Sequence, residues 1–344
     1  MSPAGSSPVR SLEGRAVDQM DAATFALAVA QDCQPVVLRG LCRHWPASAA
    51  AREGWEGLAA HLLGFDAGRT GQAFVGPPAI AGRYDYGDGP DGFNFERQSL
   101  TLAQTLERID RAASAPGAPS VYMGSLPVDD YAPGFAVANA LDILPDAARP
   151  RLWLGNASRV ACHYDTYDNL ACAVAGRRRF TLFAPQAIAD LYVGPIDHTL
   201  AGQPTSLAAS AAPGDPRYPR FPVAAAEARV VDLEPGDALY LPKLWWHQVE
   251  ALEPRNLLVN YWWDGFAAGP DAPYTTMMLA MIAIAERPLA ERQAWRAFFD
   301  HYVFRPDGHP LAHLPVERHG LLGPLGKGGY GRIRAMIMRT LRGG

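Results

Sequence analysis

Residues 234–247 read Glu234-Pro235-Gly236-Asp237-Ala238-Leu239-Tyr240-Leu241-Pro242-Lys243-Leu244-Trp245-Trp246-His247. The Pro-Gly pair predicts a tight turn, and the apolar run that follows it has the length of a buried strand. After this strand the chain passes Pro242 and two tryptophans before it reaches a histidine. The segment therefore predicts a turn and a strand that lead to a polar side chain.

Short apolar segments separated by turns continue on both sides of this stretch. We expect strands at 121–123, 152–154, 171–174, 179–183, 228–233, 238–241, 247–251 and 257–262. Regularly spaced short strands are typical of a barrel or sandwich and not of alternating strands and helices. The sequence thus predicts a mainly β protein.

The segments outside this region have a different character. A helix is predicted over 21–30 with Asp21 as its N-cap, a strand over 35–40, and helices over 55–63 and 100–112. Residues 64–95 are rich in turn formers and predict a long loop or a hairpin region. Residues 197–227 form a Pro/Ala/Gly-rich excursion that is either functional or mobile. After residue 270, helices are predicted over 274–285, 289–299 and 332–342.

Four regions follow from these patterns. Residues 1–15 are expected to be a flexible lead-in, and 16–119 an N-terminal α/β decoration that packs on the core. Residues 120–268 form the β core, and 269–344 a C-terminal helical extension. The apolar run at 277–285 exceeds what one helix face needs, which favours dimerisation through this extension.

Composition limits the class of protein. Hydrophobic residues make up 49% and charged residues 19% of 344, which is typical of a globular protein. A net charge of −4 argues against a general nucleic-acid binder. The four cysteines lack CxxC spacing and predict free thiols. We find neither a signal peptide nor an apolar run of about 18 residues, so we expect a cytoplasmic protein with no membrane segment.

A metal site is predicted from His163, Asp165 and His247. Two residues that are two apart on an extended segment point to the same side, so His163 and Asp165 can reach one ion. With nine His and 35 acidic residues, about one such pair is expected by chance, and the spacing alone is weak. A barrel strand that returns His247 to this pair completes two histidines and a carboxylate, the ligand set of non-haem iron(II) oxygenases. Core histidines and a turn-capping aspartate are the competing interpretations.

Several motifs carry a resemblance. They are Gly155-Asn156-Ala157-Ser158, His163-Tyr164-Asp165, Asn169, the segment 176–185, Pro235-Gly236-Asp237, Trp245-Trp246-His247 and Asn260-Tyr261-Trp262, preceded by the segments 35–40 and 44–46. In this order, over about residues 30–265, they resemble the cupin-like JmjC hydroxylases, whose members include the asparaginyl hydroxylase that acts on hypoxia-inducible factor. The resemblance implies a double-stranded β-helix (jelly roll) with iron(II), 2-oxoglutarate as cosubstrate and O2.

The resemblance also implies cosubstrate contacts. Arg178 stands where the family usually has a lysine that pairs with the distal carboxylate of 2-oxoglutarate. Arg178 shares strand parity with two apolar residues, and its neighbours alternate to the other face, although a solvated basic strand end is the alternative. Asn169, Asn260 and Tyr122 match positions that bind the cosubstrate or orient the water on the metal. The competing interpretations are asparagines that stabilise turns and a tyrosine that packs in the core. Trp262 matches a ring beside the cosubstrate, with core packing as an equal alternative.

Some features stay open at this stage. Lys243 is either a second anion partner or a solvated lysine. Rings and acids at Tyr84, Tyr86, Asp88, Asp91, Phe93 and Phe95 form either a wall over the metal or a loop packed on the barrel. The basic C-terminal helix, which follows Lys327, either contacts an anionic partner or is solvated.

The leading functional hypothesis is a 2-oxoglutarate-dependent dioxygenase. As a hydroxylase it would act on a protein side chain or a small molecule, and it would convert 2-oxoglutarate to succinate. The first alternative is a cupin-type metalloenzyme that does not use 2-oxoglutarate, and the second is a non-catalytic metal-binding cupin.

Overall fold

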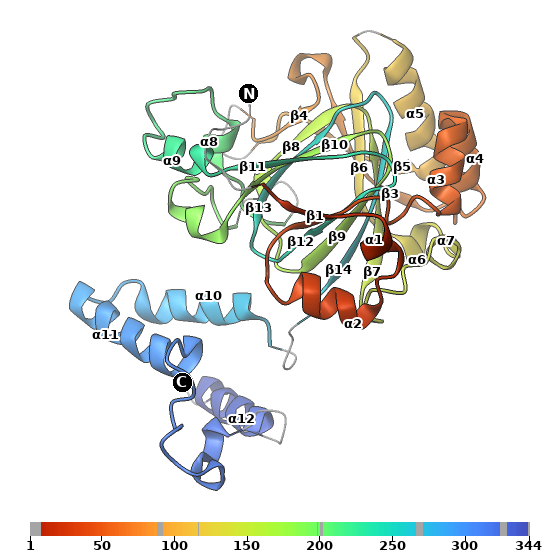
Figure 1. Ribbon diagram of the computed structural model, residues 1–344. Coiled ribbons are helices and arrows are strands. Elements are labelled where there is room, and N and C mark those ends of the chain that lie inside the picture. Colours follow the sequence, from red (N-terminus) through yellow and green to blue (C-terminus); the bar gives the residue numbers. More distant parts are fainter. Residues whose placement is uncertain are drawn as a thin grey trace. The chain divides into compact units, whose positions relative to one another are not determined.

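The computed structural model describes residues 8–87, 92–115, 117–197, 199, 202–265, 271–323 and 329–342. The chain divides into two compact units, Met1–Gly265 and Phe266–Gly344, which we describe separately. The first unit holds the strands, which run from red through yellow and green to teal in Figure 1, and the second consists of the blue helices.

The centre of the first unit is a sandwich of eight strands. These are β7 (Arg149–Gly155), β8 (Ser158–His163), β9 (Asp168–Ala175), β10 (Arg178–Phe183), β11 (Arg229–Leu233), β12 (Ala238–Leu241), β13 (Trp246–Ala251) and β14 (Asn256–Trp263). One layer has the order β12-β9-β14-β7 and the other β11-β10-β13-β8. Every neighbouring pair within these layers is antiparallel. Successive strands alternate between the layers, except that β10 and β11 are neighbours in one layer, and this arrangement is the double-stranded β-helix that the motifs implied.

The N-terminal region contributes strands to this core. β1 (Arg10–Leu12) and β2 (Val36–Leu38) extend one layer beyond β12, while β6 (Ser120–Pro127), β3 (Thr70–Gly76) and β5 (Glu96–Thr101) extend it beyond β7. The short β4 (Arg83–Tyr84) pairs with β8 in the other layer. Our expectation of a decoration packed on the core was incomplete, because this region lengthens the sheet at both edges.

Five strands were missed in the sequence, namely β1, β3, β4, β5 and β8. β3 and β4 lie in the region 64–95, which was expected to be a turn-rich loop or hairpin, β5 follows this region, and β8 carries the metal motif. β3 contains two glycines, and β5 is largely polar, so both have weak strand propensity. Pairing between β3 and both β5 and β6 stabilises them instead.

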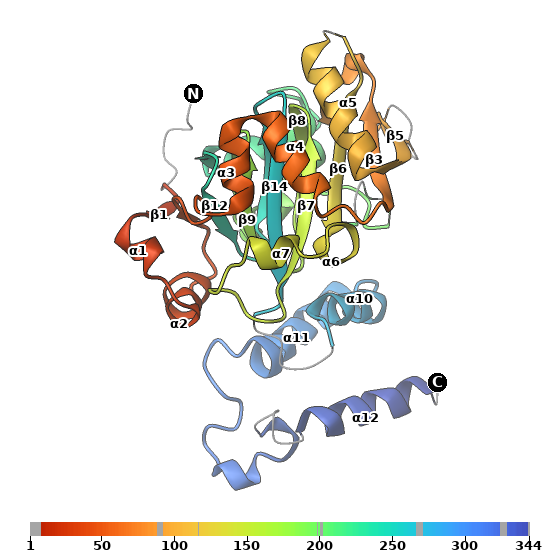
Figure 2. The same cartoon turned by 90° about the vertical axis from the view of Figure 1, so that its right-hand side faces the viewer.

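Helices cover the outer face of the nine-stranded sheet. α3 (Pro46–Glu53), α4 (Trp55–Leu63) and α5 (Leu102–Ser114) lie over the strands in Figure 2. Leu58, Leu62 and Ile109 from these helices are fully buried against Leu152 and Leu154 of β7 in one cluster. Shorter helices are α1 (Arg15–Asp18), α2 (Ala22–Phe25), α6 (Val128–Tyr131) and α7 (Phe135–Ala138). Asp21 caps α2 by accepting from the Thr24 amide (2.7 Å), which confirms the predicted N-cap.

The turn that precedes β12 is held by its own aspartate. Gly236 has φ +102°, a conformation that a residue with a Cβ rarely adopts. The Asp237 carboxylate accepts hydrogen bonds from the Glu234 amide, the Gly40 amide and the Arg39 guanidinium. The turn is thereby joined to the chain that leaves β2, and this fixes where β12 begins.

The excursion at 197–227 folds back onto the metal motif. It contains α8 (Leu207–Ser210) and α9 (Phe221–Ala226), and Thr205 forms an antiparallel bridge with His163. Residues 198, 200 and 201 lie outside the described residues. Part of this excursion, around Thr205, therefore lies beside the predicted metal site.

The second unit consists of helices. Its main elements are α10 (Pro273–Ile284), α11 (Leu289–Phe299) and α12 (Gly329–Arg342), and α10 has no buried residue. Lys327 lies outside the described residues. Among the helices that the structure describes, none combines the length and the apolar character needed to cross a membrane.

Candidate metal centre and cosubstrate cavity

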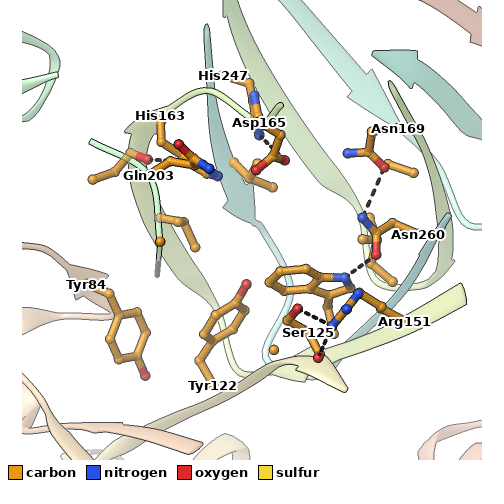
Figure 3. A pocket seen from close by; sticks show the side chains of 18 of the residues that line it. Tyr84, Tyr122, Ser125, Arg151, His163, Asp165, Asn169, Gln203, His247 and Asn260 are labelled. Atoms are coloured by element: carbon orange, nitrogen blue, oxygen red, sulfur yellow. Dashed lines mark hydrogen bonds and ion pairs between the residues drawn. The ribbon is translucent and has the colours of Figure 1, made fainter. Parts of the chain in front are cut away.

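His163, Asp165 and His247 come together at one end of the β sandwich. His163 ends β8, and it pairs in register with His247 on β13. Asp165 follows two residues later, so both residues of the motif reach the same place. One ligand atom from each of the three residues lies within 4.8 Å of the others. Figure 3 shows the three side chains pointing toward a common centre. The register of two antiparallel strands thus assembles the predicted triad.

Hydrogen bonds to the backbone orient both imidazoles. His163 Nδ1 lies 2.8 Å from the Ala161 carbonyl, and His247 Nδ1 lies 3.0 Å from the Trp245 carbonyl. A carbonyl oxygen can only accept, so each Nδ1 carries the proton and each Nε2 keeps its lone pair. His247 Nε2 is 3.7 Å from an Asp165 carboxylate oxygen. This orientation of the ring by a backbone carbonyl is typical of metal-binding histidines.

Burial shifts the titration of these groups in the metal-free protein. It lowers the pKa of His247 to about 3, and the nearby His163 contributes to the same direction. Burial raises the pKa of Asp165, and the neighbouring His163 offsets part of this rise. The neutral form of His247 is the form that binds a metal ion.

A cavity of about 610 Å³ opens beside the triad. This volume lies in the range of sites for small molecules, roughly 300–1,000 Å³. Its wall includes the three triad residues and the predicted cosubstrate residues Tyr122, Asn169, Arg178, Asn260 and Trp262. All eight residues named from the sequence therefore meet in one cavity.

Arg178 is a buried cation in the wall of this cavity. It is 3% exposed, and its Nε is enclosed without a hydrogen-bond partner. No ion pair or hydrogen bond joins it to any residue that the structure describes. Burial lowers its pKa to about 10, so the guanidinium stays charged at neutral pH. An unpaired buried charge is costly, and an anion bound in the cavity would relieve this cost.

The arginines on either side of Arg178 point the other way. Arg177 pairs with Glu253 (2.7 Å), and Arg179 pairs with Asp232 (2.7 Å) at the protein surface. The predicted alternation of side chains along β10 is confirmed. It directs Arg178 into the cavity and Arg177 and Arg179 to the surface.

A chain of side-chain amides crosses the sheet opposite Arg178. Trp153 Nε1 donates to Asn260 Oδ1 (2.5 Å), and Asn260 Nδ2 donates to Asn169 Oδ1 (3.1 Å). Asn169 and Asn260 are both buried, and the chain is drawn with dashed lines in Figure 3. In this arrangement the Asn169 amide nitrogen is the donor directed toward the triad. These asparagines are therefore core network residues as well as cavity residues.

Tyr122 and Trp262 contribute rings to the wall. Tyr122 is 8% exposed, and burial raises its pKa while the nearby Arg178 lowers it. Trp262 contacts Trp153 edge-to-face, with ring centroids 5.8 Å apart. Its indole nitrogen is buried and has no partner among the described residues.

Sequence reasoning missed several residues of the cavity. Arg97, Ser125, Arg151, Trp153 and Gln203 also line it. Arg151 and Trp153 share strand parity on β7 with each other, as do Asn260 and Trp262 on β14. This parity was visible in the segment 149–155, but a strand was predicted only over its centre.

Two other expectations are now decided in part. Lys243 pairs with Asp264 and with Asp168, and it is absent from the described cavity wall. Tyr84 lines the cavity, while Phe93 and Phe95 stack with ring centroids 5.3 Å apart. Asp88 and Asp91 lie outside the described residues. The aromatic cluster is thus partly wall and partly packing.

Comparison with known proteins agrees with this geometry. A model of the cupin-like domain matches residues 22–269. Human HSPB1-associated protein 1 is 32% identical over 150 residues, which cover 42% of this chain and 30% of that protein. Human bifunctional peptidase and (3S)-lysyl hydroxylase JMJD7 is 27% identical over 265 residues, or 67% of this chain and 77% of that protein.

A plant protein extends the comparison. Lysine-specific demethylase JMJ31 of Arabidopsis thaliana is 33% identical over 118 residues, covering 33% of this chain and 20% of that protein. This chain spans less than a third of the length of HSPB1-associated protein 1, so the similarity to that protein is confined to part of it.

Proposed function

The chain belongs to the cupin-like, JmjC-type family, and we propose that it is an iron(II)- and 2-oxoglutarate-dependent oxygenase that hydroxylates its substrate. The observation that carries this proposal is the unpaired, buried Arg178 in the same cavity as the His163, Asp165 and His247 triad. A triad alone fits many metal enzymes. A fixed cation inside the cavity adds a requirement for an anion.

The residues present fit the metal. Two imidazole Nε2 atoms and one carboxylate are the ligand set of non-haem iron(II), and they leave coordination positions open for other molecules. His163 and His247 would hold the ion through nitrogens whose direction the backbone fixes. Asp165 would supply the single negative charge.

The residues also fit the cosubstrate. Arg178 would hold the distal carboxylate of 2-oxoglutarate, since a guanidinium can bind a carboxylate through two parallel hydrogen bonds. Asn169 and Tyr122 would orient the rest of the molecule beside the metal. Bound iron(II), 2-oxoglutarate and O2 would supply the oxidising chemistry, and the protein would exclude water from it.

Arg178 distinguishes this proposal from the two alternatives. A cupin metalloenzyme that does not use 2-oxoglutarate needs the triad but has no use for a buried, unpaired arginine. A non-catalytic metal-binding cupin has no need for either an anion site or open metal positions. Under both alternatives, substitution of Arg178 should therefore have no effect on the binding or the turnover of 2-oxoglutarate.

Substitution at 177 and 178 tests the proposal with a control from the neighbouring position. We expect Arg178→Gln to weaken 2-oxoglutarate binding at least about tenfold, because a charge-assisted pair is lost. Arg178→Lys should restore part of the affinity, since it restores the charge. Arg177→Gln removes a surface ion pair and should leave binding unchanged. Binding is measured anaerobically with iron(II) present, and succinate release is measured in air.

Two results would contradict the proposal. One is wild-type protein that binds iron(II) but neither binds 2-oxoglutarate nor forms succinate. The other is equal 2-oxoglutarate affinity in the wild type and in Arg178→Gln.

A further inference from the structure

Arg151 is a second cation in the cavity, and the proposed cosubstrate does not use it. It lies on β7, in register with Asn260 on β14, and so belongs to the sheet opposite Arg178. Its guanidinium carbon lies 5.1 Å from the centre of the Trp262 ring. No carboxylate that the structure describes forms an ion pair with it.

The backbone of β6 holds this arginine in place. Arg151 Nη1 donates to both the carbonyl and the hydroxyl of Ser125, each at 2.9 Å. Ser125 has φ +59°, a left-handed conformation that is unfavourable for a residue other than glycine. The same irregular segment contains Gly124, where a Cβ would lie 2.6 Å from the Trp153 ring. One nitrogen of Arg151 is thus committed, and its other N–H groups have no described partner.

The charges in the cavity leave an excess of cation. Among the described residues of the wall, Arg97, Arg151 and Arg178 are basic, and Asp165 is the only carboxylate. In the proposed complex iron(II) and 2-oxoglutarate cancel each other, as do Asp165 and Arg178. Arg97 already has interaction partners, among them the rings of Phe74 and Phe93. Arg151 then remains as a cation of the cavity with no carboxylate partner among the described residues.

We propose that Arg151 binds an anionic group of the substrate, so that the substrate is an acid and not a lysine side chain. The inference rests on the proposed oxygenase function. Arg151 would pair with a carboxylate, while Trp153, Trp262 and Tyr122 offer ring surfaces for the apolar part of the molecule. A lysine ammonium would be repelled by the Arg151 guanidinium, and the one carboxylate in the described cavity wall, Asp165, is committed to the metal.

Matched pairs of acids and amides test this inference. The probes are benzoate with benzamide, and N-acetyl-glutamate amide with N-acetyl-glutamine amide, with N-acetyl-lysine amide as the basic probe. Each is titrated calorimetrically into protein loaded anaerobically with iron(II) and 2-oxoglutarate. We expect at least one acid to bind at least about tenfold more tightly than its amide. Arg151→Gln should remove this preference, and Arg151→Lys should retain part of it.

Arg149→Gln is the control on the same strand. Arg149 is exposed, donates to the Asp146 and Ala148 carbonyls, and is absent from the described cavity wall. This variant should keep the wild-type ratio between acid and amide. The inference is overturned if no acid is preferred over its amide in the wild type, if the preference survives Arg151→Gln, or if the lysine probe binds most tightly.

The cosubstrate is measured in the same proteins to separate the two proposals. If Arg151→Gln loses affinity for 2-oxoglutarate but keeps the preference for the acid over its amide, Arg151 is a cosubstrate residue and the inference is wrong. If wild-type protein does not bind 2-oxoglutarate, the oxygenase proposal fails. The acid and amide pairs titrated with metal alone then still decide whether Arg151 selects an acid.

Discussion

Arginine residues in this protein differ in role according to the face of the strand that carries them. Arg178 faces the cavity and has no counter-charge among the described residues, while Arg177 and Arg179 reach acidic side chains at the surface. A surface pair is worth about 0–1 kcal/mol, whereas an unpaired buried charge costs considerably more. An anion bound at Arg178 would therefore stabilise the protein, whereas Arg177 and Arg179 already have counter-charges.

Metal binding is the first prediction at this scale. We expect His163→Ala and His247→Ala each to weaken Mn(II) or iron(II) binding at least about a hundredfold, more than the loss of an outer-shell partner costs. His44→Ala is the control, because His44 contacts Arg43 away from the triad. Metal content after anaerobic loading measures the effect. Equal metal content in all four proteins would contradict the assignment.

Asp237 gives a prediction about stability. Its carboxylate accepts from the Glu234 and Gly40 amides and from Arg39 in partly buried hydrogen bonds, so Asp237→Ala removes three bonds at once. We expect a loss of about 1–3 kcal/mol in the free energy of unfolding. Asp232→Ala removes only a partly exposed pair with Arg179 and should cost less than about 1 kcal/mol. Urea denaturation compares the two, and similar losses would refute the role of the turn.

The contribution of Asp232 also has a defined pH dependence. Its hydrogen bonds with Arg179 lower the pKa of the carboxyl group below its usual value. A lowered folded-state pKa stabilises the protein above the unfolded pKa, and this stabilisation is lost as the pH falls through the folded value. The difference between wild type and Asp232→Ala should therefore disappear in strong acid.

At the scale of elements, strand pairing decides what local propensity leaves undecided. β3 and β5 are weak strands by composition, yet they pair with each other over six positions. β8 was not predicted, and its pairing with β13 brings His163 opposite His247. A slip of one residue would turn one of the two ligands to the other face.

The start of α5 supplies a prediction for one element. Thr101 and Gln104 form a capping box, in which each side chain bonds the backbone amide of the other. Thr101→Ala should lower the free energy of unfolding by about 1 kcal/mol. Thr70→Ala, at the paired position on β3, is the control and lacks a cap. Thermal unfolding compares the two variants, and an equal fall in melting temperature in both would contradict the capping role.

At the scale of the whole molecule, the second unit exposes more apolar surface than a single chain needs. Met277, Met278, Leu279, Met281 and Ile282 of α10 are each at least 40% exposed. Contiguous apolar surface of this kind is typical of a protein interface. We therefore keep the proposal that a second copy of the chain covers α10.

Light scattering tests this assembly. We expect the wild type to be a dimer and Ile282→Glu to be monomeric or to dissociate at least about tenfold more readily, because a charge would be buried at the interface. Val137→Glu places the same charge at an exposed apolar position of α7 in the first unit, and it should leave the mass unchanged. A monomeric wild type would mean that α10 has no copy-to-copy role.

The sequence by itself predicted a mainly β core from its short strands and turns, and its resemblance to a family implied the double-stranded β-helix that the structure has. Motif spacing and the same resemblance also named three candidate metal ligands and five cosubstrate candidates, which the structure brings into one cavity. Arg151, Ser125 and the fold-back of Thr205 onto His163 were decided only by the tertiary structure. They depend on which strands become neighbours and at which register, and pairing across such long separations leaves no local signal in the chain.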